Sequence, residues 1–233
     1  MVDTRFADLL QKTMMDLAER FAHPKDLDAT LSGVTGAAVR HIHGVDSADI
    51  LIFAPPERYE SIAATSALPA RLDAFQVKFQ EGPCLDAAIG EPLVRCDDLS
   101  SDPRWPRFGE SAVAAGVHSV LSFQLYTYGT RRASLNLLGS DRNAFTMEAE
   151  AFAGMIATHA ATALIAHNKE LQFQSALASR DIIGQAKGMI MERFGIDAIQ
   201  AFELLVRLSQ NSNTRVADLA AEIVTHGPDH RSH

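Results

Sequence analysis

The longest uninterrupted helical pattern in this chain begins at Thr146. Residues 155–183 contain neither glycine nor proline, and alanines are frequent throughout the run. Thr146 is a favourable N-cap, and Glu148 and Glu150 suit the positive end of a helix dipole. The pattern therefore predicts one helix from Thr146 to near Phe194, which is longer than a globular domain normally requires.

A helix of this length is most readily stabilised by a partner helix. This favours a parallel, coiled-coil-like dimer, although the heptad pattern is irregular and is interrupted by His159 and Lys169. The alternative is a pair of helices that break near His167 and Asn168.

Two shorter helical patterns follow and predict, with the end of the long helix, an all-α three-helix bundle. Gly195 ends the long helix, and Asp197 with Gln200 gives a capping-box pattern for the next one. Asn213 or Thr214 is expected to cap the third helix. Such a bundle buries a small core and offers no catalytic pocket. Its expected core residues lie at helical spacing: Ile183, Ala186, Ile190, Phe194, Ile199, Phe202, Leu205, Val206, Val216, Leu219, Ala220 and Ile223.

Basic and amide side chains occupy other positions of the same helices. Helical spacing places Arg180, Gly184, Lys187, Gly188 and Met191 on one face of the long helix. A second group lies near the junction of the last two helices: Arg207, Asn211, Asn213 and Arg215. Arginine and lysine suit phosphates, and amides suit exposed base edges, so the groups predict a nucleic-acid surface. The alternative is ordinary solvated charge.

Gly184 and Gly188 are expensive in this helix. Each costs roughly 1 kcal/mol relative to alanine in a helix interior. We therefore expect a close neighbour at these positions, either a packed helix or a ligand.

The net charge of −8 is unevenly distributed. Residues 169–226 contain six Lys/Arg and seven Asp/Glu, whereas residues 1–168 contain 14 and 21. An acidic first part repels polyanions, so the composition excludes indiscriminate nucleic-acid binding. Specific DNA binding is also disfavoured, because no helix shows the basic N-terminal half of a recognition helix.

The first part of the chain alternates between helical and strand patterns. Helices are expected over 4–22, from residue 26, over 68–78, after Gly82-Pro83 and over 104–115. Strands are expected over 37–43, 47–55, 59–65, 93–96 and 118–129. The last of these is expected to form a hairpin with a strand that begins after residue 129. This order predicts an α+β fold with helices packed on an antiparallel sheet.

The two cysteines, Cys84 and Cys96, are too few for a disulfide framework, and no Cys/His spacing suggests zinc. His41 and His43 alternate on an expected strand without a third ligand, so we predict no metal site. Trp105 is expected to be a core residue. No signal peptide and no run of 18 apolar residues is found, which predicts a cytoplasmic protein without a membrane span.

The C-terminal region resembles the ANTAR domain. The similarity rests on these positions: Ser179, Arg180, Gln185, Ala186, Lys187, Gly188, Met191, Gly195, Ala201, Phe202, Leu205, Ser209, Asn213 and Ala220. The resemblance implies an RNA-binding module of transcription antitermination regulators, which bind paired stem-loops in nascent leader RNA, usually as dimers. Family members are often basic where Val206 and Ala217 stand here, which predicts weaker binding or a stronger need for the dimer.

Together with the surface pattern, the ANTAR resemblance defines a set of expected RNA-binding residues. They are Arg180, Gln185, Lys187, Gly188, Arg193, Arg207, Ser209, Asn211, Asn213 and Arg215.

Residues 5–165 resemble the GAF domains that precede ANTAR modules. The matching features are Gln76, Glu81-Gly82-Pro83-Cys84, Asp97-Asp98-Leu99, Arg104-Trp105-Pro106, Gly116 and Ser134-Leu135-Asn136. GAF domains bind small molecules or chromophores, or only dimerise, and the fold does not choose among these. We expect no cofactor beyond an unidentified small-molecule ligand.

The expected organisation is a GAF-like sensor and dimerisation domain over 1–167, an ANTAR domain over 168–228 and a tail over 229–233. Homodimerisation is expected through the N-terminal and linker helices. Two alternatives are a protein-interaction module without RNA binding and a thiol-dependent enzyme like the GAF-fold methionine sulfoxide reductases. The enzyme needs more thiols than two, and a buried structural cysteine is the better reading of Cys84.

Overall fold

The structure is a computed structural model of the chain. It describes residues 11–13, 15–16, 27–54, 58–128 and 131–226. The helix expected over 4–22 and the tail over 229–233 therefore lie mostly or entirely outside the described residues. The chain divides into two compact units, Met1–His167 and Asn168–His233.

The first unit is built on a five-stranded sheet in the order β2-β1-β5-β4-β3, with every neighbouring pair antiparallel. The strands are β1 (Ser47–Ala54), β2 (Arg58–Ile62), β3 (Leu93–Cys96), β4 (Ser119–Tyr128) and β5 (Arg131–Gly139). The expected α+β class and the hairpin of the last two strands are confirmed.

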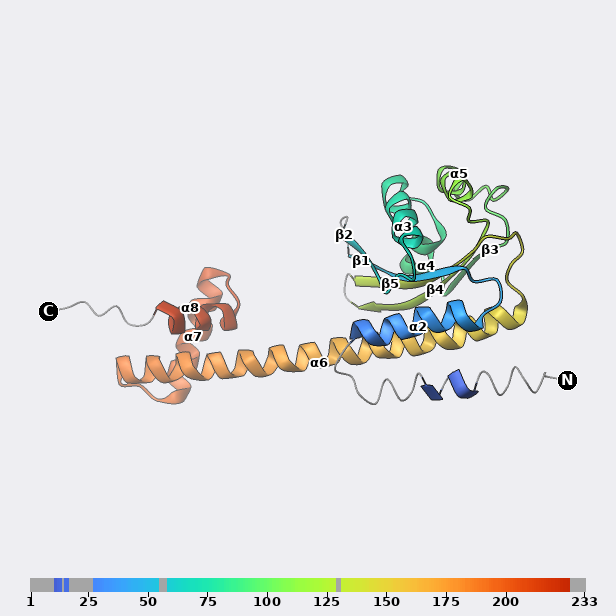
Figure 1. Ribbon diagram of the computed structural model, residues 1–233. Coiled ribbons are helices and arrows are strands. Elements are labelled where there is room, and N and C mark those ends of the chain that lie inside the picture. Colours follow the sequence, from blue (N-terminus) through green and yellow to red (C-terminus); the bar gives the residue numbers. More distant parts are fainter. Residues whose placement is uncertain (1–10, 14, 17–26, 55–57, 129–130, 227–233) are drawn as a thin grey trace. The chain divides into compact units, whose positions relative to one another are not determined.

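Helices cover both faces of this sheet. They are α2 (Leu27–His41), α3 (Ala67–Phe79), α4 (Pro83–Ile89), α5 (Pro106–Ala114) and α6 (Met147–Phe194). Figure 1 shows α2 and the first part of α6 on one face and α3, α4 and α5 on the other. The buried clusters agree: Leu31 and Phe152 pack with Ile50 of the sheet, whereas Leu72 and Phe108 pack with Val120.

The two faces of the sheet differ in polarity, because successive side chains of a strand point to opposite sides. The α2–α6 face is apolar at its centre, with Ile50 and Leu135 fully buried. On the opposite face, Asp49, Asn136 and Ser122 stand in register across β1, β5 and β4. We call these three residues the polar row. All three are at most 1% exposed.

One strand assignment was wrong. Residues 37–41, expected to begin a strand, complete helix α2. Val34, Ala38 and Ile42 recur at helical spacing and are all buried in the apolar core, so tertiary packing supports a helix there. His41 ends this helix and His43 lies in the following turn, so the two histidines do not alternate on a strand.

The long helix is continuous over 48 residues, and the alternative with a break near His167 is wrong. The backbone N–H of Ala149 donates to Thr146 Oγ1 at 3.1 Å, which confirms Thr146 as its N-cap. Gly195, with φ of 63°, follows its last residue.

The second unit contains the end of α6, then α7 (Ala198–Ser212) and α8 (Val216–His226). The predicted capping box is confirmed: Asp197 accepts from the N–H of Gln200, and the Gln200 side chain accepts from the N–H of Asp197. Asn213 ends α7 in the left-handed conformation, with φ of 50°, and does not cap α8. Asparagine tolerates that conformation well.

The core of the second unit is small. Its fully buried apolar residues come from all three helices: Ala186, Ile190, Ala201, Leu205 and Ala220. Three large residues expected in it are exposed, Phe194 by 59%, Ile199 by 73% and Phe202 by 45%. Small alanine side chains at the contacts allow the helices to approach closely. Helix α7 is oriented with Ala201 and Leu205 facing inward.

Candidate nucleic-acid interface

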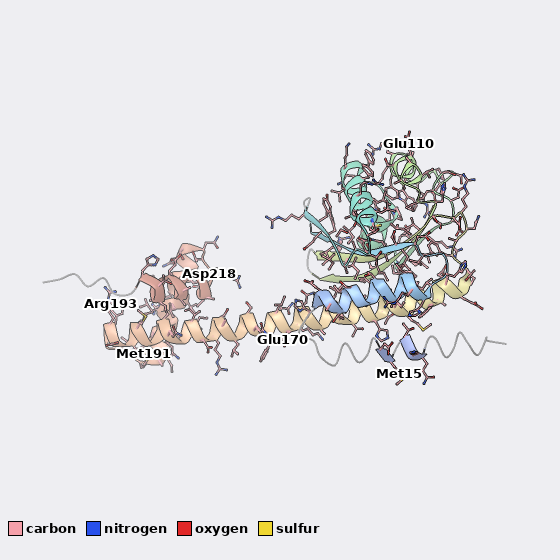
Figure 2. All side chains as sticks on the ribbon, viewed as in Figure 1. Met15, Glu110, Glu170, Met191, Arg193 and Asp218 are labelled. Carbon is pink, nitrogen blue, oxygen red and sulfur yellow. The ribbon has the colours of Figure 1, made fainter. Side chains whose placement is uncertain are left out.

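The expected RNA-binding residues of α6 lie on its exposed surface with one exception. Arg180, Gln185, Gly188 and Arg193 are exposed, and Lys187 is half-buried. At 100° per residue, Arg180, Lys187 and Gly188 share a side of the helix, whereas Arg193 points from another. Figure 2 shows Met191, a neighbour of Lys187 on that face, and Arg193 on opposite sides of the last turns of α6.

Gly184 and Gly188 have open space beside them. A Cβ added at either position would meet nothing within 4 Å. We expected a close neighbour here, either a packed helix or a ligand, and no helix of the described residues packs against these glycines. No atom of the described residues therefore requires glycine at these two positions, which lie beside Arg180 and Lys187 on the helix.

The α7–α8 junction carries the second expected group. Arg207, Asn211, Asn213 and Arg215 are all exposed. Arg207 lies one helical turn after Glu203 and approaches it at 3.9 Å, with both side chains largely in solvent. A pair of this kind is weak, so Arg207 can turn to another anion at little cost.

Ser209 differs from the rest of the set because it is buried. Its hydroxyl donates to the carbonyl of Thr214 across the turn that ends α7. This bond holds Asn213 and Arg215 in place, so Ser209 is placed to position the junction rather than to reach a ligand.

An apolar groove lies on another side of the unit, between the end of α6, α7 and α8. It encloses about 1050 Å³. Its lining includes Met189, Ile190, Phe194, Leu204, Leu208, Leu219 and Ile223, with Glu192, Arg193, Glu222 and His226. Of the expected RNA-binding set, only Arg193 lines it. The sequence interpretation missed this groove because it placed Phe194 in the core, and the exposure of Leu208 is not visible in the helical pattern.

The two thiols of the first unit are unsuited to nucleophilic chemistry. Cys84 is 2% exposed, and burial, followed by the charges of Asp73 and Asp49, raises its pKa well above the usual value. Burial also raises the pKa of Cys96, to about 12. A thiolate is the reactive form, so both cysteines are held in the inert one. Within the described residues, no group of three His, Cys, Asp or Glu side chains is placed to hold a metal ion.

Trp105 and its surroundings are structural. The indole is buried, its N–H donates to Asp86 at 2.8 Å, and the Arg104 guanidinium stacks over its ring at 4.0 Å. The expectation of a core tryptophan is confirmed.

Family comparison resolves both units. A GAF domain model matches residues 24–165, and an ANTAR domain model matches residues 171–224. This chain is a GAF-family protein with an ANTAR domain. No curated protein matches its sequence. The ANTAR domain is an RNA-binding module, which supports RNA as a partner of this GAF–ANTAR protein, and the architecture is that of a regulator rather than of a catalyst.

Solved structures share the GAF fold at low sequence identity. The GAF domain of a phosphoenolpyruvate-protein phosphotransferase from Coxiella burnetii is 20% identical, with a TM-score of 0.52 over 72% of this chain and 96% of that one. The chromophore-binding domain of a bacteriophytochrome from R. palustris is 16% identical, with a TM-score of 0.56 over 73% and 64%. A free methionine-R-sulfoxide reductase from Neisseria meningitidis is 13% identical, with a TM-score of 0.50 over 71% and 91%. At these identities the likeness extends to the fold alone.

Helix α6 is long and apolar enough, by length and composition, to cross a membrane, and it is the one such helix among the described residues. The apolar window that passes this test is 44% buried inside the fold. Phe152 and Ile156 belong to the core that α6 forms with the sheet, so part of the apolar surface of this helix is buried inside the GAF domain.

Proposed function

We propose that this protein is a bacterial, cytoplasmic antitermination regulator. In this proposal a dimer of ANTAR domains binds two stem-loops in a nascent leader RNA and thereby prevents a terminator from forming. The GAF domain receives a signal that changes the pairing of the linker helices. The observation that carries the proposal is the ANTAR match over 171–224, combined with the exposed Arg180 and Gly188 and the half-buried Lys187 on one side of α6.

Charge and geometry support selective rather than general RNA binding. The module is close to neutral, with six Lys/Arg and seven Asp/Glu over residues 169–226, so it lacks the broad basic field that binds any nucleic acid. Its cations and amides lie instead at a few defined positions on α6 and at the α7–α8 junction. In the recognition of RNA loops, amide side chains hydrogen-bond to unpaired bases and cationic side chains contact the phosphates.

The dimer is supported by an exposed apolar stripe on α6. Phe173 is 66% exposed and Leu177 49%, and the two lie one turn apart on the same side of the helix. Single exposed apolar residues are common, but two large ones one turn apart on a long helix suit a second helix.

RNA binding is tested with a transcript that carries two short stem-loops and a control in which only the loop bases are scrambled. We expect the intact transcript to bind more tightly at moderate salt. Equal affinity for both would exclude reading of the loop sequence. If the protein binds neither RNA, a protein partner in the apolar groove becomes the better explanation.

Lys187→Ala is expected to weaken RNA binding several-fold and to lower the slope of log affinity against log salt by about 1, as for one lost phosphate contact. Lys169→Ala, the same charge change at an exposed position outside the proposed surface, serves as the control. If the two variants behave alike, Lys187 does not contact the RNA.

The dimer is tested by sedimentation of the full chain with and without RNA. Phe173→Glu with Leu177→Glu introduces four like charges across a paired helix and is expected to give monomers. A double variant that sediments as the wild type would move the dimer contact elsewhere.

A further inference from the structure

The edge strand β3 carries one residue that is bonded to elements on both faces of the sheet. Val94 and Cys96 of this strand pack with Trp105 on the face covered by α3, α4 and α5. Because successive side chains of a strand point to opposite sides, the side chain of Arg95 points to the other face, where α6 lies (Figure 1). Arg95 therefore stands between the two layers of helices.

The guanidinium of Arg95 holds the first turn of α6. Nη1 pairs with Glu150 Oε2 at 2.7 Å, and Nη2 donates to the carbonyl of Phe145 at 2.6 Å. Phe145 directly precedes the N-cap Thr146, whereas Glu150 lies four residues after that cap. One side chain therefore bonds the chain on both sides of the helix start and fixes the direction in which α6 leaves the sheet.

Asp97 completes this contact. Its Oδ1 accepts from Arg95 Nε at 2.8 Å, and its backbone carbonyl accepts from the N–H of Asn143, in the loop before α6, at 2.8 Å. We call Arg95, Asp97 and Glu150 the Arg95 clamp.

The clamp is held more firmly than an ordinary surface ion pair. The side chains of Arg95 and Glu150 are 29% and 22% exposed, whereas those of Arg207 and Glu203 are 70% and 62% exposed and lie 3.9 Å apart. Short hydrogen bonds between charged groups are about twice as strong as neutral ones, and partial burial reduces their screening. The clamp is therefore able to transmit a displacement of β3 to α6.

The backbone of Arg95 is bonded to the opposite face. Its carbonyl accepts from Arg104 Nη2 at 2.8 Å. The guanidinium of Arg104 pairs with Asp102 at 2.6 Å and stacks over the ring of Trp105 at 4.0 Å. Trp105 Nε1 in turn donates to Asp86 of α4 at 2.8 Å. A continuous run of contacts thus leads from α4 around the edge of the sheet to the first turn of α6.

We propose that the Arg95 clamp is the coupling element between α4 and the linker helix α6. Strand β3 is four residues long and is paired on one side only, so it shifts against its neighbour at lower cost than a central strand. A movement of α4 that displaces Trp105 and Arg104 moves the Arg95 carbonyl, and the clamp then carries the movement to α6 or releases its first turn. This proposal names the regulatory route of the sensing role proposed above and rests on that role.

The length of α6 gives the clamp its effect. At 1.5 Å per residue, a helix of 48 residues is about 70 Å long. A change of direction at the first turn grows along this length, so it alters how two such helices pair.

The test measures amide hydrogen exchange in the first turn of α6, by mass spectrometry of a peptide covering residues 145–152. The N–H groups of Ala149 and Glu150 both donate to Thr146, so their exchange reports the opening of this turn. Asp86→Ala removes the acceptor of the Trp105 N–H and is expected to speed this exchange several-fold, as is Arg95→Ala.

The double variant decides whether the effect passes through the clamp. Mutations at residues that share no partner usually have additive effects on free energy. If Arg95 carries the coupling, Asp86→Ala with Arg95→Ala should exchange no faster than Arg95→Ala alone. Multiplied accelerations, or no acceleration by Asp86→Ala, would overturn the proposal.

A matched pair of variants tests the α6 side of the clamp. Glu150→Gln removes the charge that pairs with Arg95 and is expected to speed exchange of the same turn. Glu148→Gln makes the same charge change at an exposed position of that turn and is the control, since both acids lie near the positive end of the helix dipole. Equal acceleration by both would show that charge near the helix start sets the exchange, which would overturn the assignment.

Folding of each variant is followed by the fluorescence of Trp105. Trp105 is the one tryptophan of the chain and is buried with Val94 and Phe108, so its thermal transition reports on the GAF domain. Arg95→Lys keeps the charge without the planar fork and is expected to exchange at an intermediate rate; it replaces Arg95→Ala if that variant fails to fold. Val117→Ala lies in the same buried cluster and should lower the midpoint without faster exchange in α6. Equal acceleration by Val117→Ala would reduce the effect to a general loss of stability and overturn the proposal.

The two proposals fail separately, because the exchange is measured without RNA. Affinity for the transcript with two stem-loops is measured on the same variants. We expect Asp86→Ala and Arg95→Ala to change it in the same direction and without additivity. Coupled exchange with unchanged RNA affinity would preserve the clamp and refute control of RNA binding by the GAF domain. RNA binding with uncoupled exchange would refute the clamp alone.

Discussion

The two units of this protein differ in where their characteristic polar side chains lie, in the interior or on the surface. The GAF domain buries Asp49, Asp73 and Asn136 under its helices, whereas the ANTAR module keeps its basic and amide residues on the surface and buries five small or medium apolar residues. The difference follows from size, because the fraction of surface that a fold can bury rises with chain length. A unit of this small size has no interior for a ligand, so its binding must use its surface. The larger unit can enclose one.

The largest effect is expected from the core of the ANTAR module. Leu205 is fully buried among few residues, so Leu205→Ala should destabilise the module by about 2–5 kcal/mol. RNA binding should be lost, as measured by affinity and by far-ultraviolet circular dichroism. Leu208→Ala, at a site 42% exposed, is the control. If Leu205→Ala lowers the Trp105 transition equally, the two units unfold as one.

The paired glycines provide the sharpest separation of stability from binding. Because a Cβ at Gly184 or Gly188 meets nothing within 4 Å, replacing both by alanine should stabilise the helix by about 1 kcal/mol each. The same change should weaken RNA binding or dimerisation, since the added methyl groups block a close approach. A double variant that is more stable and still binds and dimerises normally would show that neither glycine contacts a partner.

The buried carboxyls of Asp49 and Asp73 make GAF stability depend on pH. The folded pKa of Asp73 is raised, so its contribution to stability is complete below 3.8 and is lost as pH rises through the folded value. Across that window the Trp105-monitored unfolding free energy should fall by about 1.4 kcal/mol per pH unit. Asp73→Asn should flatten the profile, whereas Glu60→Gln, at an exposed position of β2, should not. A profile that is identical in Asp73→Asn would place the titrating group elsewhere.

The smallest effect is expected at the surface ion pair of the ANTAR module. Glu203→Gln removes a partner 3.9 Å from Arg207 where both side chains are mostly exposed. Stability should change by no more than about 0.5 kcal/mol, and RNA binding should stay the same or improve slightly, because Arg207 is released. A marked loss of RNA affinity would make Glu203 part of the interface.

Sequence alone determined the elements whose signals are local. The 48-residue α6, the capping box at Asp197 and the antiparallel β4–β5 pair follow from N-cap chemistry, the absence of helix breakers and strand alternation, all of which act between near neighbours. The ANTAR and GAF resemblances rest likewise on motifs that can be read along the chain. The strand predicted from the local pattern at residues 37–41 was wrong, because packing of α2 against the sheet stabilises a helix there.

Only the tertiary structure decided which side chains meet. Helical spacing identified the apolar residues of the ANTAR module, but the close approach of its helices through alanines left Phe194, Ile199 and Phe202 exposed. Asp49 and Asp73 are distant in sequence and occur in unremarkable segments, so nothing local marks them as a pair. The two residues become a pair because β1 lies beneath α3. The free-energy cost of burying a charge depends on the groups around it and on the presence of a counter-charge, which only the tertiary structure shows.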